Sequence, residues 1–251
     1  MKYKVYIFLM TILLVFCEVK SQNRIQINIP TADFETEYVW RTIQDINFFE
    51  DNNYQISLPK DPLIEDLKIK AKKEKLTNED YNKLKTFIRD SVYDVTDYQK
   101  GYEKIKNQLP LINNLVNEIS ELDYKWNFKE FSVYNINLTL YGPGGRYDSD
   151  EGSILIFTTS KGQFKSYDNP ANTIIHEIIH IGIESAIINK FQVPHPLKER
   201  IVDTFVLLNF KDDLPNYRIQ NMGEYRTDTY IKTKADLKSL YSIVKKIMKS
   251  K

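Results

Sequence analysis

Cysteine is almost missing from this sequence of 251 residues, where Cys17 is the only one. The chain therefore forms no internal disulfide, and any metal it binds is not held by a cluster of thiolates. Glycine and proline are also scarce, at 8 and 9 residues, and no segment repeats at periods of about 20 to 50 residues. These absences exclude collagen-like, linker-rich and solenoid chains.

An excess of charge of either sign is also missing, since 35 Lys and Arg are balanced by 34 Asp and Glu. The chain thus lacks the electrostatic footprint of a nucleic-acid-binding protein and the polybasic attraction of a protein bound to anionic lipid. The chain is instead rich in large apolar side chains, with 42% hydrophobic residues, 17 Tyr and 13 Phe. This composition indicates a packed globular chain and no nucleic-acid partner.

No apolar run is long enough to span a bilayer comfortably, which takes about 20 residues. The longest, at residues 5–16, follows Lys2 and Lys4 and is succeeded by polar residues from Glu18. A charged start, a short apolar run and a small residue at Ser21 are typical of a secretory signal peptide. We expect residues 1–21 to be removed, which leaves no stable membrane span.

Export to a secreted or periplasmic location follows from this signal, and the mature chain would hold 32 basic and 33 acidic residues. Its fold would depend on core packing, because Cys17 leaves with the signal. A lipid anchor on Cys17 is an alternative, although Phe16 before it is bulkier than such signals usually allow.

Helical spacing dominates residues 22–127 after a short strand at 24–30. Thr31 or Asp33 can cap the first helix, and further helices are expected to begin near Asp61, Thr77 and Thr96. Lys and Glu fill their outer faces and are expected to be solvated. The sequence therefore predicts a helical N-terminal region.

Residues 128–251 begin with alternating apolar residues at 133–140 and again at 153–159, which we interpret as a long hairpin around a glycine-rich loop. Helices are then expected from Asn169 and Pro170 to about Asn189, from Pro196 to about Phe210, and after Thr233. The fold class is accordingly α+β, with the two regions divided near residue 127.

Two of the three histidines stand in the sequence His176-Glu177-Ile178-Ile179-His180, an HExxH motif. On a helix, imidazoles at positions i and i+4 point the same way and can both bind one Zn²⁺ at about 2.0–2.1 Å. The remaining face of this helix is nearly all isoleucine, so the helix should be buried. Its polar stripe, which also includes Glu184, then needs a partner, and a metal ion supplies one.

This segment resembles the zincins, the HExxH zinc metallopeptidases. The resemblance implies a small, mostly antiparallel sheet whose edge strand, here 153–159, precedes a buried active-site helix and binds an extended peptide by main-chain hydrogen bonds. Ile183 and Ala186 stand where the metzincin branch has glycine and histidine. The chain instead resembles the gluzincins, which take a glutamate from a following helix.

Glu199 occupies that place, with eighteen residues between it and His180. The resemblance makes Glu199 the third zinc ligand and Asp203 a carboxylate that accepts a proton from the back of His176. Three other side chains compete for the ligand role. Glu184 is about 12 Å along the helix from His176, His195 belongs to an expected exposed turn, and Asp203 has a shorter side chain.

The resemblance implies hydrolysis of a peptide or protein substrate by a zinc-activated water, with Glu177 as the general base. It also implies that a Tyr or His stabilises the developing oxyanion. Tyr217, Tyr225, Tyr230 and His195 are candidates, and Tyr225 ranks first because Gly223 beside it suggests a tight loop.

Two other functions are compatible with the sequence. The first is an exported binding or envelope-assembly protein whose zincin-like site is structural or degenerate, although decay usually removes the base and Glu177 is present. The second is an interaction scaffold with an accidental HExxH, which predicts no metal. Elemental analysis of the mature protein distinguishes them.

Overall fold

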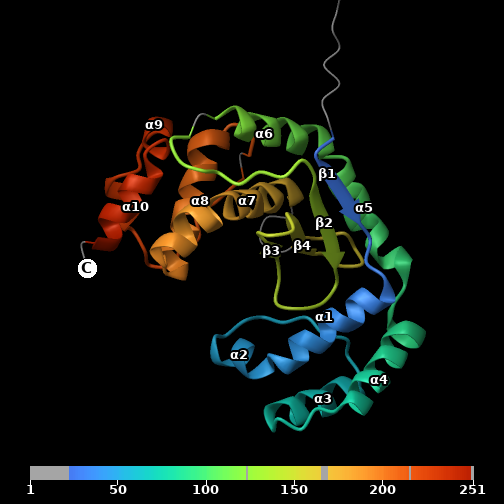
Figure 1. The fold of residues 1–251 in the computed structure, drawn as a ribbon. Helices are drawn as coiled ribbons and strands as arrows, with labels where there is room; N and C mark the ends of the chain where they lie inside the picture. The colour runs from blue at the N-terminus through green and yellow to red at the C-terminus, as the bar shows by residue number, and fades with distance from the viewer. Residues whose placement is uncertain (1–22, 123, 165–168, 215, 250–251) are drawn as a thin grey trace, which may run out of the picture.

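The computed structural model describes residues 23–122, 124–164, 169–214 and 216–249. The expected signal peptide and Cys17 lie outside these residues. The described chain is α+β, as predicted, with a four-stranded sheet surrounded by helices (Figure 1). No helix within the described ranges is long and apolar enough to cross a membrane.

The sheet is mixed, in the order β1-β2-β4-β3. Its strands are β1 (Ile25–Asn28), β2 (Tyr134–Thr139), β3 (Arg146–Asp148) and β4 (Ser153–Phe157). β1, β2 and β4 are parallel, and β3 alone is antiparallel, to β4. The expectation of a mostly antiparallel sheet was therefore wrong.

The predicted long hairpin was wrong for the same reason. β2 and β4 pair in parallel, with Ile136 opposite Ile154, so the chain between them must return along the sheet. That returning segment contains β3, which pairs with residues 153–155 of β4 and forms the sheet edge. An alternating apolar pattern reports which side chains are buried but not the direction of the strand, and this is why the two strands were interpreted as a hairpin. The edge at 153–159, which the resemblance implied, is instead an interior strand.

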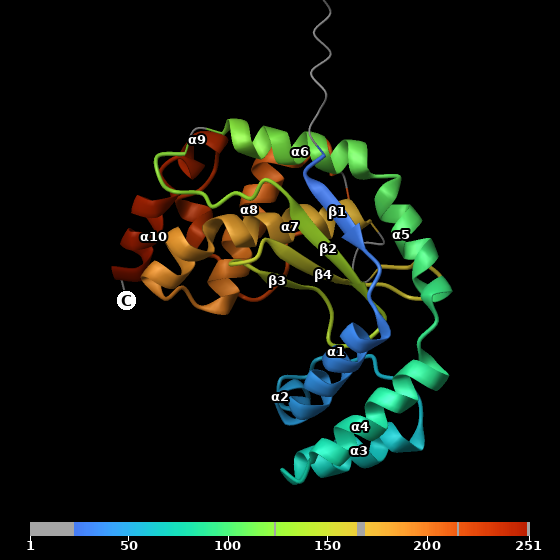
Figure 2. The ribbon, with the colours of Figure 1, turned by 45° about the vertical axis from the view of Figure 1, so that its right-hand side comes forward.

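Four helices form a helical layer with its own hydrophobic core (Figure 2). The helical layer consists of α1 (Ala32–Gln44), α2 (Ile46–Asp51), α3 (Pro62–Lys72) and α4 (Asn78–Phe87). Thr31 and Asp61 cap α1 and α3, and Thr77 forms a capping box with Asp80, as the sequence predicts. A π-helical turn, η1 (Ile88–Val92), and a 3₁₀ turn, η2 (Val95–Tyr98), lead out of this layer.

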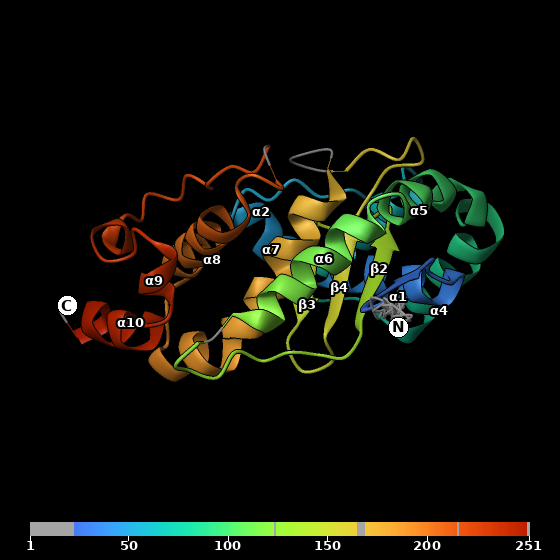
Figure 3. The same ribbon diagram turned by 90° about the horizontal axis from the view of Figure 1, so that it is seen from above.

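The rest of the N-terminal region packs with the C-terminal half. β1 pairs with β2, and the helices α5 (Gln99–Lys106) and α6 (Leu109–Glu121) contact β1 and α7. Figure 3, a view from above, shows α6 lying across α7. Buried residues of both halves of the chain, the first at Ile25 and the last at Ile247, thus form one main core. The buried residues of α1–α4 do not belong to it and form the separate core of the helical layer.

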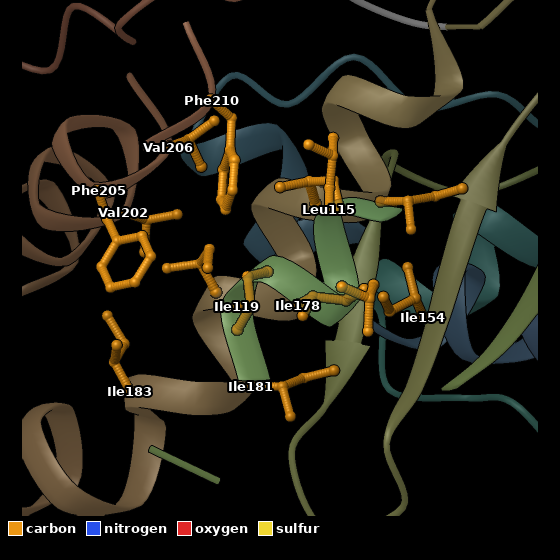
Figure 4. Close-up of a cluster of buried hydrophobic side chains, with 14 of the residues drawn as sticks. Leu115, Ile119, Ile154, Ile178, Ile181, Ile183, Val202, Phe205, Val206 and Phe210 are labelled. Atoms are coloured by element: carbon orange, nitrogen blue, oxygen red, sulfur yellow. The ribbon is translucent and has the colours of Figure 1, made fainter. Parts of the chain in front are cut away.

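The centre of the main core is α7 (Pro170–Ile183), which contacts β3, β4, α6 and α8 (His195–Phe210). Figure 4 shows Ile178 and Ile181 of α7 packing among side chains of α6, β4 and α8. Gly182 allows a close approach here, because a β-carbon at this position would lie 1.9 Å from the ring of Phe128. Asn169 caps α7 and Pro170 occupies its first position, as predicted.

The remaining elements complete this body. A π-helix, η3 (Glu184–Asn189), continues α7 to the residue where its end was predicted. A 3₁₀ turn, η4 (Arg226–Thr229), precedes α9 (Lys234–Leu237) and α10 (Leu240–Lys249). Thr233 and Asp236 form a capping box at the start of α9, the helix expected after Thr233.

Glu35 of α1 joins the helical layer to the main core. Its carboxylate is fully buried and accepts hydrogen bonds from the Tyr98 hydroxyl (2.6 Å), the Thr139 hydroxyl (2.9 Å) and the Leu140 N–H (3.2 Å). Burial raises the pKa of Glu35 above its ordinary value, although these hydrogen bonds act to lower it. The charge pattern places glutamates of this region on outer faces, and Glu35 is an exception.

Candidate metal centre

The two histidines of the HExxH motif face each other on the buried helix α7. Their Nε2 atoms are 2.9 Å apart, and the residues are 8% and 2% exposed for His176 and His180. The spacing of four residues places both rings on one side of the helix, and the isoleucines that fill the other sides exclude water from it. The two imidazoles therefore form a preorganised pair.

Glu199 of α8 completes a group of three ligand atoms. Its Oε2 lies 3.3 Å from Nε2 of His176 and 3.3 Å from Nε2 of His180. One ligand atom from each of the three residues lies within 4.8 Å of the others, and all three side chains are buried. The structure thus brings together the two histidines and the glutamate that the sequence selects, in a group able to bind a metal ion.

Tyr217 mediates the contact that was predicted between His176 and Asp203. Its hydroxyl donates to Asp203 Oδ1 at 2.7 Å, and its oxygen lies 2.5 Å from His176 Nδ1. Nδ1 and Oδ1 themselves are 3.4 Å apart. Asp203 is therefore behind His176, as expected, but it orients the ring mainly through the tyrosine.

This arrangement fixes the tautomer of a neutral His176. Because the hydroxyl proton of Tyr217 is donated to Asp203, the tyrosine oxygen can only accept a hydrogen bond from the imidazole. The proton then resides on Nδ1, and the lone pair of Nε2 points to His180 and Glu199. A histidine that binds a metal through Nε2 needs this tautomer.

The electrostatics of the group favour a positive charge among these three residues. Burial opposes a charge on His176, but hydrogen bonds to Asp203 and Glu199 outweigh it and raise the pKa of His176 to about 10. Burial also acts to raise the pKa of Glu199, yet the two histidines hold that pKa well below its ordinary value. Burial lowers the pKa of His180 to about 4, so this ring is neutral at pH 7. A divalent cation satisfies such a group as a proton does, and competes with it.

The back of His180 is supported differently. Its ring stacks on the ring of Tyr147 from β3, with centroids 4.9 Å apart and planes 7° apart. Its buried Nδ1 has no hydrogen-bond partner among the described residues. Tyr147 donates its hydroxyl to Glu184 at 2.7 Å and accepts from Lys198 at 2.9 Å. The stacked ring of Tyr147 therefore positions His180, and the hydrogen bonds of Tyr147 with Glu184 and Lys198 position Tyr147.

Glu177 lies beside the three ligand residues and is not one of them. Burial, with a further contribution from the negative charge of Glu199, raises the pKa of Glu177 to about 7, although His176 acts to lower it. The segment before β3 passes close to this carboxylate, because a β-carbon at Gly145 would lie 3.4 Å from Oε1. Glu177 can thus exchange a proton near neutral pH next to the candidate metal centre.

A cavity of about 600 Å³ opens over these residues. Its walls come from the segment around β3, the end of β4, α7, the start of α8 and the chain that follows α8. The residues that line it are Tyr54, Pro143, Gly144, Gly145, Arg146, Tyr147, Ile156, Phe157, Phe164, Thr173, His176, Glu177, His180, His195, Lys198, Glu199, Gln220 and Met222. The candidate centre is therefore accessible to a ligand of several residues.

Tyr225 does not line this cavity, so the structure gives no support to its selection as the oxyanion-stabilising residue. The residue is 55% exposed, its hydroxyl donates to Asn221 at 2.9 Å, and its ring lies under the guanidinium of Arg200. Tyr230 packs under Lys246 and does not line the cavity either. The conformation of Gly223 is left-handed, as the tight loop suggested, but the loop turns Tyr225 to the surface.

The other ligand candidates occupy secondary places. Glu184 contacts Tyr147, as described above. His195 lines the cavity with its side chain 55% exposed, and its Nδ1 is 3.4 Å from Glu199 Oε1. Sequence reasoning missed the roles of Tyr147 and Gln220 at this site. Tyr147 lies within the glycine-rich loop, which is a usable signal, whereas nothing in the sequence around Gln220 distinguishes it.

The chain matches no protein-family model, no curated protein sequence and no solved structure at a significant level. The geometry of the site and the chemistry of its residues therefore carry the functional argument.

Proposed function

We propose that this protein is an exported, zinc-dependent metallopeptidase of the gluzincin kind. The observation that carries the proposal is the convergence of His176, His180 and Glu199, with Glu177 adjacent to them, at the base of an open cavity. Two imidazoles and one carboxylate are the three protein ligands of many catalytic zinc sites, which keep a further position for water or substrate.

The donor set supports zinc over other metals. Two neutral nitrogens and one carboxylate oxygen suit Zn²⁺, whereas Mg²⁺ and Ca²⁺ prefer sets made of oxygen atoms. A zinc ion held there would supply a Lewis acid that polarises the scissile carbonyl and lowers the pKa of a coordinated water to about 7.

The chain's own contribution to hydrolysis is assigned to Glu177. Because its pKa is raised to about 7, the carboxylate can accept a proton in the first half of the reaction and deliver it to the leaving amine in the second. The Tyr217 and Asp203 pair keeps the Nε2 lone pair of His176 directed at the ligand group throughout.

An extended peptide is the proposed substrate, and β3 is its proposed docking strand. β3 pairs with β4 on one side only, and Arg146 and Tyr147 of β3 line the cavity. A strand edge of this kind binds an extended chain through main-chain hydrogen bonds. The edge strand differs from the one predicted, but it lies beside the same helix.

Elemental analysis of the mature protein, purified without added metal, tests the proposal together with a peptide library. We expect about one zinc ion per chain, hydrolysis of some peptides, loss of hydrolysis on chelation and its return with zinc. Bound metal without turnover on any peptide would favour the exported binding protein. Absence of metal would reject the zinc site and leave a scaffold.

A further inference from the structure

We propose that the side-chain amide of Gln220 is the donor that stabilises the carbonyl oxygen of the substrate as negative charge develops on it. The proposal rests on the proposed peptidase function and identifies the oxyanion-stabilising residue that Tyr225 does not provide. It follows from the position of Gln220 on the chain segment after α8, where the segment enters the cavity.

Gln220 reaches the candidate metal centre directly. Its Nε2 donates to Glu199 Oε2 at 3.0 Å and lies 3.5 Å from His176 Nε2. The side chain lines the cavity and is partly exposed. A glutamine amide has two N–H bonds, and Glu199 accepts one of them. The other lies near His176 Nε2, and a metal ion on that nitrogen would release it to a ligand atom beside the metal ligands.

The backbone of Gln220 is held by the same carboxylate that orients His176. The Gln220 N–H donates to Asp203 Oδ2 at 2.6 Å, while Oδ1 accepts from Tyr217. Asp203 is fully buried, so its two oxygens fix the tyrosine and the glutamine backbone relative to each other. A donor held this way is preorganised, which is the condition under which it lowers a reaction barrier.

Three other donors at the cavity make contacts elsewhere or lie further from the ligand atoms. The Tyr147 hydroxyl donates to Glu184, and the Lys198 ammonium donates to that same hydroxyl. His195 is largely exposed, and its Nδ1 is 3.4 Å from Glu199 Oε1. Gln220 is a neutral donor within hydrogen-bond distance of the group.

The test compares Gln220→Met with Asn221→Leu in the mature zinc-loaded protein. Both variants remove an amide from one segment, but Asn221 does not line the cavity. Three affinities are measured for each variant: for zinc, for a peptide phosphoramidate that carries tetrahedral anionic oxygens, and for a peptide thiol that binds zinc through sulfur. Turnover of a cleaved peptide is measured beside them.

Removal of one preorganised oxyanion donor costs about 10²–10³-fold in kcat. We expect Gln220→Met to lose that factor in kcat and a similar factor in phosphoramidate affinity, with thiol affinity nearly unchanged. Asn221→Leu should resemble the wild type in all readouts. The loss of the hydrogen bond to Glu199 should lower zinc affinity by no more than the roughly 10–100-fold typical of groups that support a ligand.

Equal phosphoramidate affinity in Gln220→Met and wild type would overturn the assignment of Gln220 and leave the peptidase function intact. So would a parallel loss of phosphoramidate and thiol affinity, because that pattern reports a disturbed zinc ion. A wild-type protein that binds neither zinc nor the phosphoramidate would overturn the proposed function, and the role of Gln220 with it.

Discussion

In the helical layer the charged side chains of α3 and α4 lie on exposed or partly exposed faces, apart from the buried capping residue Asp80, whereas those at the facing surfaces of α7 and α8 are buried against one another. Glu65 pairs with Lys68, and Glu79 pairs with Lys83, at positions open to solvent. Glu199 and Asp203 are buried, and each contacts His176 or a residue bound to it. Both regions have carboxylates at helical spacing, but their surroundings differ.

The difference in burial shows why carboxylates imply a ligand site in one region and not in the other. An exposed carboxylate is satisfied by water, so its ion pair contributes little and implies no ligand. A buried carboxylate must be compensated by protons, hydrogen bonds or a metal. The buried carboxylates of the α7–α8 pair therefore indicate a site that binds a ligand or a metal ion, and the exposed carboxylates of α3 and α4 indicate a solvated surface.

The largest expected effect is the loss of zinc from Glu199→Ala. Removing this oxygen from the ligand group should weaken zinc binding by orders of magnitude and abolish hydrolysis, as should His176→Ala. Asp203→Ala should cost about 10–100-fold in zinc affinity, because it supports the ligands without binding the metal. Competition with a chromogenic chelator measures all three dissociation constants.

Glu184→Ala is the matched control, since it removes a carboxylate that follows α7 and bonds Tyr147 rather than the ligand atoms. It should keep zinc with a smaller loss of affinity than Asp203→Ala, because it acts on His180 only through the stacked ring of Tyr147. If Glu199→Ala bound zinc as tightly as the wild type while Asp203→Ala or His195→Ala lost it, the gluzincin assignment would fail, although the two histidines could still form a site.

The next effect is on rate alone. Glu177→Gln should retain zinc and lose about 10²–10⁴ in kcat, because the amide cannot accept the proton that the carboxylate takes. Zinc content and turnover are measured on the same preparation. A Gln variant with most of the wild-type rate would show that Glu177 is not the base.

Glu35 is an exception to the contrast between the two regions, because it is a buried carboxylate of the helical layer that has a structural role. Glu35→Ala should lower the free energy of unfolding by about 1–3 kcal/mol, since it leaves buried donors of Tyr98, Thr139 and Leu140 without their acceptor. Urea denaturation measures this. Zinc affinity should not change, and a loss of zinc would mean that the layer supports the metal centre.

The pH dependence of stability sharpens that prediction. The pKa of Glu35 is raised by burial in the folded state, so protonation favours folding. Its stabilising contribution is fully present below the unfolded pKa of about 4.5 and is lost as the pH rises through the folded value. Glu35→Gln should remove this slope, and its difference from the wild type should shrink as the pH rises. A constant difference across that range would contradict the raised pKa.

The smallest effect is expected at the exposed pair of Glu79 and Lys83. Glu79→Ala should leave the midpoint of thermal unfolding, zinc affinity and turnover unchanged within error, because water replaces the lost contact. A clear loss of stability in thermal unfolding would show that the helical layer depends on its surface charges more than its exposure suggests.

Most helix starts could be predicted, whereas the sheet could not. Thr31, Asp61, Thr77 and Asn169 are capping residues whose hydrogen bonds reach only two or three positions along the chain, so local sequence is sufficient. Strand direction depends on the route of the chain between β2 and β4, and the short β3 within that route has no distinct pattern. The pairing was therefore misassigned even though both strands were located.

The sequence by itself determined the pair His176 and His180, because helical spacing places both rings on one face, and its resemblance to the gluzincins selected Glu199 as the candidate third ligand and Glu177 as the candidate base. Only the tertiary structure decided which side chains support them. Tyr217, Gln220 and Tyr147 reach the centre from a segment after α8 and from the edge strand, and their contacts follow from packing between elements distant in sequence. No local spacing encodes such contacts, because they depend on where the folded elements meet.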